Sequence, residues 1–231
     1  MNGWSWSSFG EYLFHPLMIY GAWTTIWLTA ASVTIGLVIG LIIAFLLLSK
    51  NPIFHGIGKF YIWVWRGTPL LAQLMIIYTG LPLIGLKLSV VVSALIGLGL
   101  NEGAFLAEIV RAGIISINKG QTEASRALGM TSPTLMRLIV IPQAFRFIVP
   151  AVGNRINGML KMSSLASVIS MEELLRQSQM LTQEKFAVLE IFIVATLYYL
   201  SMTTVWGQIQ GRIEAYYGRA YSEIRLSAEA R

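Results

Sequence analysis

The chain has 231 residues, of which 55% are hydrophobic and only 12% are charged. A soluble domain carries about 25% charged residues, and a disordered chain is poor in apolar ones, so this composition excludes both classes. The net charge of +6 is scattered at the borders of apolar runs rather than gathered in a patch, so we expect no nucleic acid partner. We predict an integral membrane protein that contacts lipid.

Five apolar runs are long enough to cross a membrane, since a helical crossing needs about 20 apolar residues. In chain order they cover residues 21–48, 60–86, 88–115, 147–171 and 186–208. The fourth run also contains two cations, a proline and two glycines. We therefore predict an all-α membrane protein with five transmembrane helices in a single domain over residues 1–231.

The basic residues of the connecting segments predict the orientation, because cytoplasmic loops are enriched in Lys and Arg. With the N-terminus outside, twelve basic residues fall in the inner segments. The outer segments then carry only three, which are Lys87, Arg176 and Lys185. We expect the N-terminus outside and the C-terminus inside, with residues 210–231 forming a cytoplasmic tail.

The inner segment over residues 116–146 is longer than a simple tether requires. Thr122 can cap a short helix through Leu128, and Gly129 can end that helix in the left-handed conformation. Ser132-Pro133 is expected to begin a second helix, and Ile141-Pro142 to disrupt it. We predict a helix-turn-helix that docks another protein. An amphipathic segment lying on anionic lipid is the alternative.

Polar residues inside the expected crossings are candidates for function, because they are costly in lipid. The candidate substrate-pathway residues are Arg66, Gln73, Asn101, Glu102, Arg155, Lys161, Ser163 and Ser164. Arg66 could instead extend to the lipid headgroups. Glu108 and Arg111 are spaced as an intrahelical ion pair, which is the interpretation we favour for them.

Glu102 and Lys161 supply an anion and a cation at comparable depth. A zwitterionic amino acid needs both: a cation near its carboxylate and an anion near its ammonium group. A broken helix at Lys161–Ser167 could also present backbone groups to a substrate. The alternative is that Glu102 and Lys161 pair with each other across the bundle, since buried charges need partners.

Several motifs of the chain, in the expected order, resemble those of ABC importer permeases. Glu123-Ala124-Ser125, Gly129 and Ile141-Pro142 resemble the cytoplasmic EAA motif, with Ser125 in place of alanine. Further stretches resemble polar amino-acid permeases of the histidine, glutamine and arginine type: Arg66-Gly67-Thr68-Pro69-Leu70, Ala107-Glu108-Ile109 with Arg111-Ala112-Gly113, Gly120-Gln121-x-Glu123, Pro142-Gln143-Ala144, and Asn154 with Lys161 and Ser164-Leu165. The resemblance covers roughly residues 18–210.

The resemblance implies a permease subunit of an ATP-driven importer of the bacterial inner membrane, which imports a polar amino acid or a close derivative. Its implied partners are a second permease, identical or homologous, two ATPase subunits, and a periplasmic or lipid-anchored binding protein. The chain lacks the G-x-x-x-x-G-K-[ST] motif, so we expect no cofactor in it, and ATP and Mg bound by the ATPase. The residues implied in ATPase coupling are Glu123, Ala124, Ser125, Gly129 and Pro142.

Departures from the family pattern leave the substrate's side chain open. Many relatives have an acidic residue after the equivalent of Asn154, where this chain has Arg155, which would favour an anionic group. Glu102 stands where small residues are common and would favour a cationic group. The alternative for Arg155 is that it faces Glu173 or the headgroups. Met162 stands where the relatives usually have Asp or Ser.

Two other classes of protein compete with an importer subunit. A stand-alone channel or secondary transporter is disfavoured by the docking loop and by the small size of the chain. A membrane enzyme is disfavoured because the sequence has no cysteine, no aspartate and only two histidines, and offers no paired carboxylates or nucleophile–base set. We therefore expect a non-catalytic transmembrane subunit without a metal site.

Overall fold

The computed structural model describes the backbone of residues 5–229 and the side chains of residues 5–216. Every regular element in that part of the chain is helical. The elements are α1 (Trp6–Leu13), α2 (Pro16–Leu48), α3 (Pro52–Gly67), α4 (Leu70–Met75), the π-helix η1 (Ile76–Gly80), the 3₁₀-helix η2 (Leu81–Ile84), α5 (Val90–Ile115), α6 (Lys119–Ala127), α7 (Ser132–Leu135), the π-helix η3 (Met136–Val140), α8 (Ile141–Met162), the 3₁₀-helix η4 (Ser163–Ile169), α9 (Leu174–Lys185) and α10 (Val188–Glu229).

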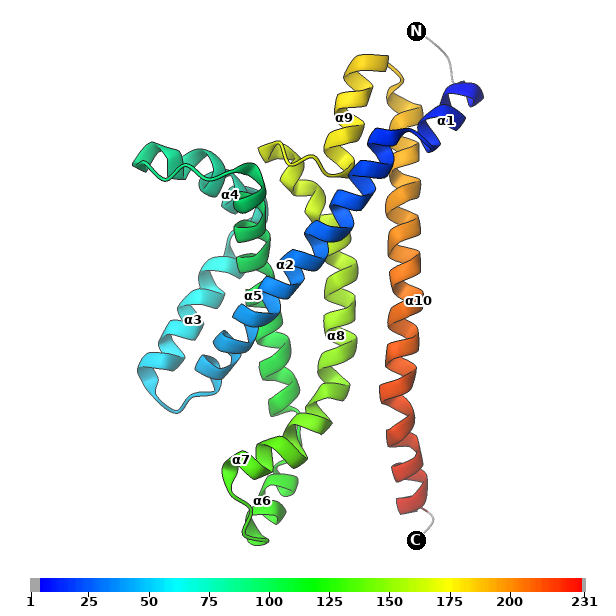
Figure 1. The fold of residues 1–231 in the computed structure, drawn as a ribbon. Coiled ribbons are helices and arrows are strands. Elements are labelled where there is room, and N and C mark those ends of the chain that lie inside the picture. The colour runs from blue at the N-terminus through cyan, green and yellow to red at the C-terminus, as the bar shows by residue number, and fades with distance from the viewer. Residues whose placement is uncertain (1–4, 230–231) are drawn as a thin grey trace.

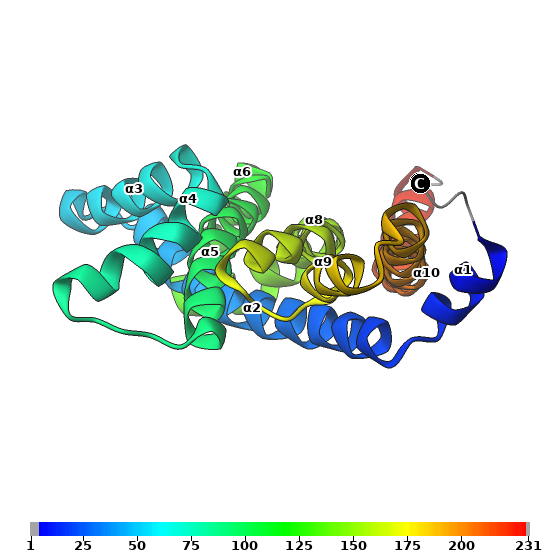
Figure 2. The ribbon, with the colours of Figure 1, turned by 90° about the horizontal axis from the view of Figure 1, so that it is seen from above.

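The long helices form an open bundle (Figure 1). Helix α2 runs obliquely along α5, and α8 lies between α5 and α10, as Figure 2 shows from above. Helices α1 and α9 lie at one end of the molecule (Figure 1). Helices α6 and α7 lie at the opposite end, toward which the last turns of α10 also run. The bundle therefore has two distinct ends.

In the part of the chain that the structure describes, four helical stretches are long and apolar enough to cross a membrane: α2, α5, Ser132–Ile169 and Val188–Tyr216. The second expected crossing is not one helix, because α3 meets the Leu70–Ile84 stretch at an angle of 99°. Pro69 causes the break: it restricts Thr68 to an extended conformation, with ψ of 148°. The number of spans is five only if this bent pair counts as one.

Pro142 does not disrupt the helix, which corrects the expectation from sequence. The chain stays helical from α7 through η3 into α8, and the strain is taken up by the wider π-turn over Met136–Val140. A π-turn placed before a proline accommodates the missing N–H without ending the helix. The short helices at one end of the bundle are thus joined to α8 by continuous helix.

Two further elements differ from the expected pattern. Helix α9, over Leu174–Lys185, was not predicted from the sequence, and it ends where Phe186 adopts a positive φ of 55°. Helix α10 continues without interruption to Glu229, so most of the segment expected as a C-terminal tail extends the last span. Residues 230–231 of that segment lie outside the described residues, as do its side chains beyond residue 216.

The close approach of α2 and α5 depends on small residues. A Cβ atom added to Gly36 would lie 2.9 Å from Cβ of Glu102, closer than real side chains pack. Small residues at such a crossing let two helix backbones approach within a membrane. Glu102 is therefore pressed against the backbone of α2 and fully buried. Its position in the bundle is fixed by packing as well as by charge.

Candidate functional site

A buried ion pair joins α5 to α8. Arg155 Nε lies 3.0 Å from Oε1 of Glu102, and Nη2 of the same guanidinium contacts Oε2. The Glu102 side chain is 0% exposed, whereas that of Arg155 is 21% exposed. The alternative that Glu102 pairs with Lys161 is therefore wrong, because its partner is Arg155. Two-point contact with a guanidinium is the geometry that best compensates a buried carboxylate.

The ion pair is one end of a row of side chains along α5. Phe105 and Glu108 follow Glu102 at intervals of three residues, so all three lie on one face of the helix. The Arg155 guanidinium lies 4.0 Å from the centre of the Phe105 ring, and that of Arg66 lies 5.0 Å from it. Both distances are within the range of cation–π attraction.

The other end of the row is held by Glu108. Nη2 of Arg111 lies 2.9 Å from Oε2 of Glu108 and Nε lies 3.2 Å from Oε1, which confirms the expected intrahelical pair. Nη1 of Arg66 lies 3.9 Å from the same Oε2. Arg66 thus faces α5 beside Phe105. We call Glu102, Phe105, Glu108, Arg155, Arg66 and Arg111 together the α5 charge cluster.

Asn101 and Gln73 stabilise the bend between α3 and α4. The Trp65 carbonyl, freed at the end of α3, accepts hydrogen bonds from Asn101 Nδ2 at 2.9 Å and from Gln73 Nε2 at 3.0 Å. Gln73 Nε2 also lies 2.8 Å from the hydroxyl of Thr68. The two amides contact each other at 3.0 Å. These two predicted pathway residues are engaged in holding the break.

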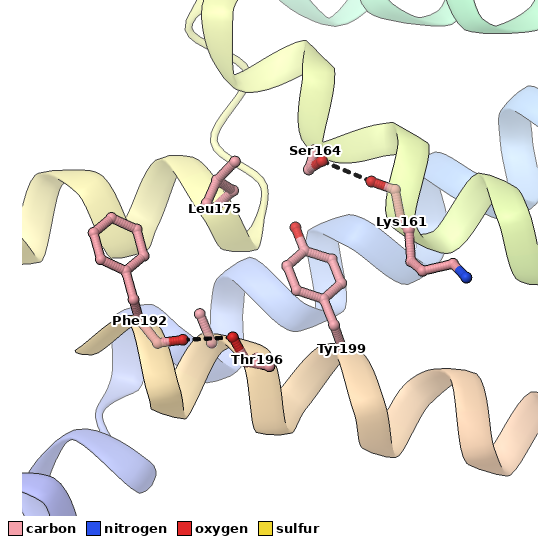
Figure 3. A pocket seen from close by; sticks show the side chains of 7 residues that line it. Lys161, Ser164, Leu175, Phe192, Thr196 and Tyr199 are labelled. Atoms are coloured by element: carbon pink, nitrogen blue, oxygen red, sulfur yellow. Dashed lines mark hydrogen bonds between the residues drawn. The ribbon is translucent and has the colours of Figure 1, made fainter. Parts of the chain in front are cut away.

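Lys161 and Ser164 line a separate cavity of about 300 Å³ at the end of the bundle near α9. Figure 3 shows them facing α10 across this cavity, whose remaining lining residues are Leu175, Phe192, Ala195, Thr196 and Tyr199. Helix α8 ends at Met162 and continues as the 3₁₀-helix η4, so the expected irregularity after Lys161 is present. Ser163, the first residue of η4, is fully buried.

Glu173 lies beside this cavity and does not contact Arg155, so the alternative that Arg155 faces Glu173 is wrong. Its carboxylate accepts hydrogen bonds from the Tyr199 hydroxyl at 2.7 Å and from the Arg176 backbone N–H at 2.8 Å. Burial raises the pKa of the Glu173 carboxyl, and these hydrogen bonds oppose the rise. Arg155 and Lys161 therefore serve different parts of the structure.

Helix α6 has well-defined ends. It begins one residue after Asn118, whose side chain caps it by accepting from Gly120 N–H at 2.8 Å, so the expected cap at Thr122 is wrong. At the other end Gly129 has a φ of +79°, as expected. Hydrogen bonds from Gly129 N–H to the Arg126 carbonyl and from Met130 N–H to the Ser125 carbonyl complete a Schellman motif.

The coupling residues expected from the resemblance, on α6, just after it and at the start of α8, differ in exposure. Glu123, Ala124 and Gly129 are exposed, whereas Ser125 is buried and donates a hydrogen bond to the Gln121 carbonyl. Pro142 is exposed at the start of α8. Leu128, which closes α6, is 84% exposed.

Sequence reasoning missed Phe105 as a member of the charge cluster, and it named Leu128 only as the end of the expected short helix. The spacing Glu102-x-x-Phe105-x-x-Glu108 was a usable signal, because it places an aromatic ring between two carboxylates on one helical face. Among the described residues, no group of three or more histidine or acidic side chains could hold a metal ion.

The comparison with known families decides the class of this protein. The family described as "Binding-protein-dependent transport system inner membrane component" matches residues 36–217, which include α5, α6, α7 and α8 entirely. The chain belongs to this family. It is accordingly a multi-pass inner-membrane permease component, in a class of transport systems in which a separate subunit hydrolyses ATP.

Individual relatives cover most of the permease. It is 37% identical over 218 residues to the arginine transport system permease protein of Corynebacterium glutamicum, a match that covers 88% of this chain and 69% of that protein. It is 36% identical over 201 residues to the glutamine transport system permease protein of Escherichia coli K12, covering 86% and 92% of the two chains.

Solved structures agree with the fold. A chain from the crystal structure of an amino acid ABC transporter with histidines superimposes with a TM-score of 0.88 at 37% identity, covering 93% of this permease and all of that chain. An inward-facing MetNI methionine ABC transporter shares the fold, with a TM-score of 0.74 at 20% identity over 87% of this chain.

Proposed function

We propose that this permease, with a second permease that is identical or homologous, forms the translocation path of an ATP-driven importer for a polar amino acid or a close derivative. The family match over residues 36–217 carries the proposal. The amino-acid class is supported by relatives named for arginine and glutamine transport. Two ATPase subunits, which bind ATP and Mg, and a periplasmic or lipid-anchored binding protein complete the importer.

The exposed side of α6 is the proposed docking surface for the ATPase. Glu123, Ala124 and Leu128 are exposed on this helix, and small residues permit a partner's groove to approach closely. Gly129 sets the direction in which the chain leaves it. Ser125 and Pro142 act indirectly: one hydrogen-bonds within α6, and the other lies where the loop continues into α8.

The continuous helix after the loop supplies a mechanical connection. Helices α7 and η3 run into α8 without a break, and α8 carries Arg155 of the ion pair with Glu102. A displacement of α6 is therefore proposed to move α8 against α5. Coupling in proteins travels through such rigid helices and packed side chains when they have two discrete arrangements.

The proposed orientation places α1 and α9 outside and the α6–α7 end in the cytoplasm. The two sets lie at opposite ends of the bundle (Figure 1), and the basic residues of the connecting segments favour the α6–α7 end. Cysteines introduced at Gly10, which has open space around it, and at exposed Gln121 test this. The first should react only from outside and the second only from inside; the reverse pattern would contradict the orientation.

The substrate path is proposed to involve the partly exposed cations. Arg155 and Arg66 flank Phe105, and Lys161 with Ser164 lines the cavity near α9. Three other candidates are proposed to position residues of this path and not to line it. Glu102 binds Arg155, and Asn101 with Gln73 fixes the bend beside Arg66. Ser163 is buried where α8 passes into η4, so it too is proposed to stabilise the path and not to contact the substrate.

Transport by the reconstituted complex tests the proposed function. The permease is placed in proteoliposomes with its ATPase and its binding protein, and uptake of radiolabelled amino acids is measured with and without internal ATP. Uptake should require both ATP and the ATPase. Equal uptake by the permease alone would contradict the proposal and indicate a stand-alone channel or secondary transporter.

A further inference from the structure

At one end of the α5 charge cluster the carboxylate lies inside and its guanidinium partner lies outside, whereas Glu108 at the other end is 27% exposed and paired with Arg111. Glu102 is 0% exposed, and both of its oxygens contact Arg155. The Arg155 side chain is 21% exposed and that of Arg66 is 40% exposed. At the Glu102 end, an approaching molecule therefore meets the guanidinium groups of Arg155 and Arg66 first, with the aromatic ring of Phe105 between them.

The guanidinium groups retain unused hydrogen-bond donors. Arg155 uses Nε and Nη2 for Glu102, while its Nη1 makes no hydrogen bond among the described contacts. Arg66 comes no nearer than 3.9 Å to Glu108, whose two oxygens already accept from Arg111. A guanidinium has five N–H donors and binds carboxylates through pairs of them. Each of these two arginines can therefore still bind an anion.

The charges of the cluster do not cancel. Three guanidinium groups face two carboxylates, so one positive charge is left over. The other glutamates with described side chains in the candidate spans are also engaged. Glu190 accepts from the Ser5 backbone N–H and Glu214 from the Gln210 amide. Each of these carboxylates in the described part of the spans already has at least one partner, and Glu102 and Glu108 each contact an arginine through both oxygens.

This distribution answers the question that the sequence left open. Glu102 would favour a cationic substrate group if it were accessible, but it is buried and both of its oxygens contact Arg155. Resting on the proposed import function, we propose that Arg155 and Arg66 make this permease selective for amino acids whose side chain carries a carboxylate, and that it disfavours arginine-like side chains. Like charges placed together in a binding site are strongly unfavourable, and complementary charges determine specificity.

The test measures binding to the permease without its binding protein, whose own selectivity would otherwise hide that of the cluster. The purified complex of permease and ATPase in lipid nanodiscs is titrated with radiolabelled L-glutamate, L-glutamine and L-arginine. We expect L-glutamate to bind at least about tenfold more tightly than L-arginine, with L-glutamine between them. Equal or tighter binding of L-arginine would overturn the inference and leave the import function intact.

Exchanging the two charges sharpens the test. In the double variant Glu102→Arg, Arg155→Glu the pair is retained, but the partly exposed partner becomes the carboxylate, so the preference should move toward L-arginine. Lys185→Glu is the matched control. This lysine pairs with Glu184 at the end of α9, away from the cluster, and its replacement should leave the preference unchanged. An unchanged preference in the double variant would also overturn the inference.

A second variant covers the case in which the exchanged pair does not fold. Glu102→Gln, Arg155→Met replaces both charges, and it should bind L-glutamate and L-arginine with similar affinity. Retained preference for L-glutamate in this variant would contradict the role of Arg155. Absence of binding of all three amino acids to the parent complex, together with no ATP-dependent uptake of any amino acid once the binding protein is added, would refute the import function itself.

Discussion

The α5 charge cluster and the α6–α7 loop differ in how they are held together. The cluster joins α3, α5 and α8 through buried or partly buried charges that lie far apart in the sequence. The loop is exposed, and its turn is fixed by hydrogen bonds among residues 118–130. Substitutions in the cluster should therefore affect assembly of the bundle. Substitutions in the loop should leave the bundle intact and affect its connection to a partner.

The largest effect is expected when one charge of the buried pair is removed. Glu102→Gln or Arg155→Met alone leaves the other charge uncompensated, at a cost of about 3–5 kcal/mol. The double variant should recover most of this loss, because removing both partners can be nearly neutral. Thermal unfolding in detergent, followed for the parent, both single variants and the double, measures the coupling. Additive losses would contradict the pairing.

The bend between α3 and α4 should show a smaller effect. Gln73→Leu and Asn101→Leu each leave the Trp65 carbonyl with one hydrogen bond fewer, at a cost of about 1–3 kcal/mol. Spin labels on cysteines at exposed Ile57 and Leu83 should report a broader distance distribution, because the 99° bend is less constrained. Gln143→Leu, which removes a hydrogen bond to the Ile139 carbonyl elsewhere, is the control. An unchanged distribution would show that proline alone fixes the bend.

Much of the loop could be predicted from the sequence, because its signals are local. Gly129 and Ser132-Pro133 act through their own backbone preferences, and both were expected to act as they do. Thr122 failed as a cap because Asn118, another favoured capping residue, starts the helix one turn earlier. Pro142 does not end the helix, contrary to the expectation, because the π-turn before it accommodates the missing backbone N–H.

The cluster could be predicted only in part. The sequence correctly selected Glu102, Arg155 and Arg66 as costly residues, but the choice of partner depended on how α5 and α8 are rotated. Lys161 lies six residues after Arg155, on another part of the α8 surface, and lines a cavity toward α10. Helix rotation follows from packing across the bundle, such as the Gly36 contact with Glu102, which periodicity alone does not reveal.

Replacing Phe105 should have the smallest effect on the free energy of unfolding, and this effect should depend on the arginines of the cluster. Phe105→Leu keeps an apolar side chain and removes two cation–π contacts, at a cost of about 1 kcal/mol. In a double-variant cycle with Arg66→Met, the two losses should not add, because both changes remove the same contact. Thermal unfolding in detergent measures both. Strict additivity would show that the ring serves only as packing.

Coupling through α6 is the central claim, and Gly129 gives its most direct test. Gly129→Val is strained at a φ of +79°, by roughly 1–2 kcal/mol, although no atom crowds the site. Gly129→Asn tolerates this conformation and serves as the control. In the assembled complex with the ATPase and the loaded binding protein, we predict that Gly129→Val abolishes stimulated ATP hydrolysis while assembly and basal hydrolysis persist. Undiminished stimulation in the assembled Val variant would contradict the account.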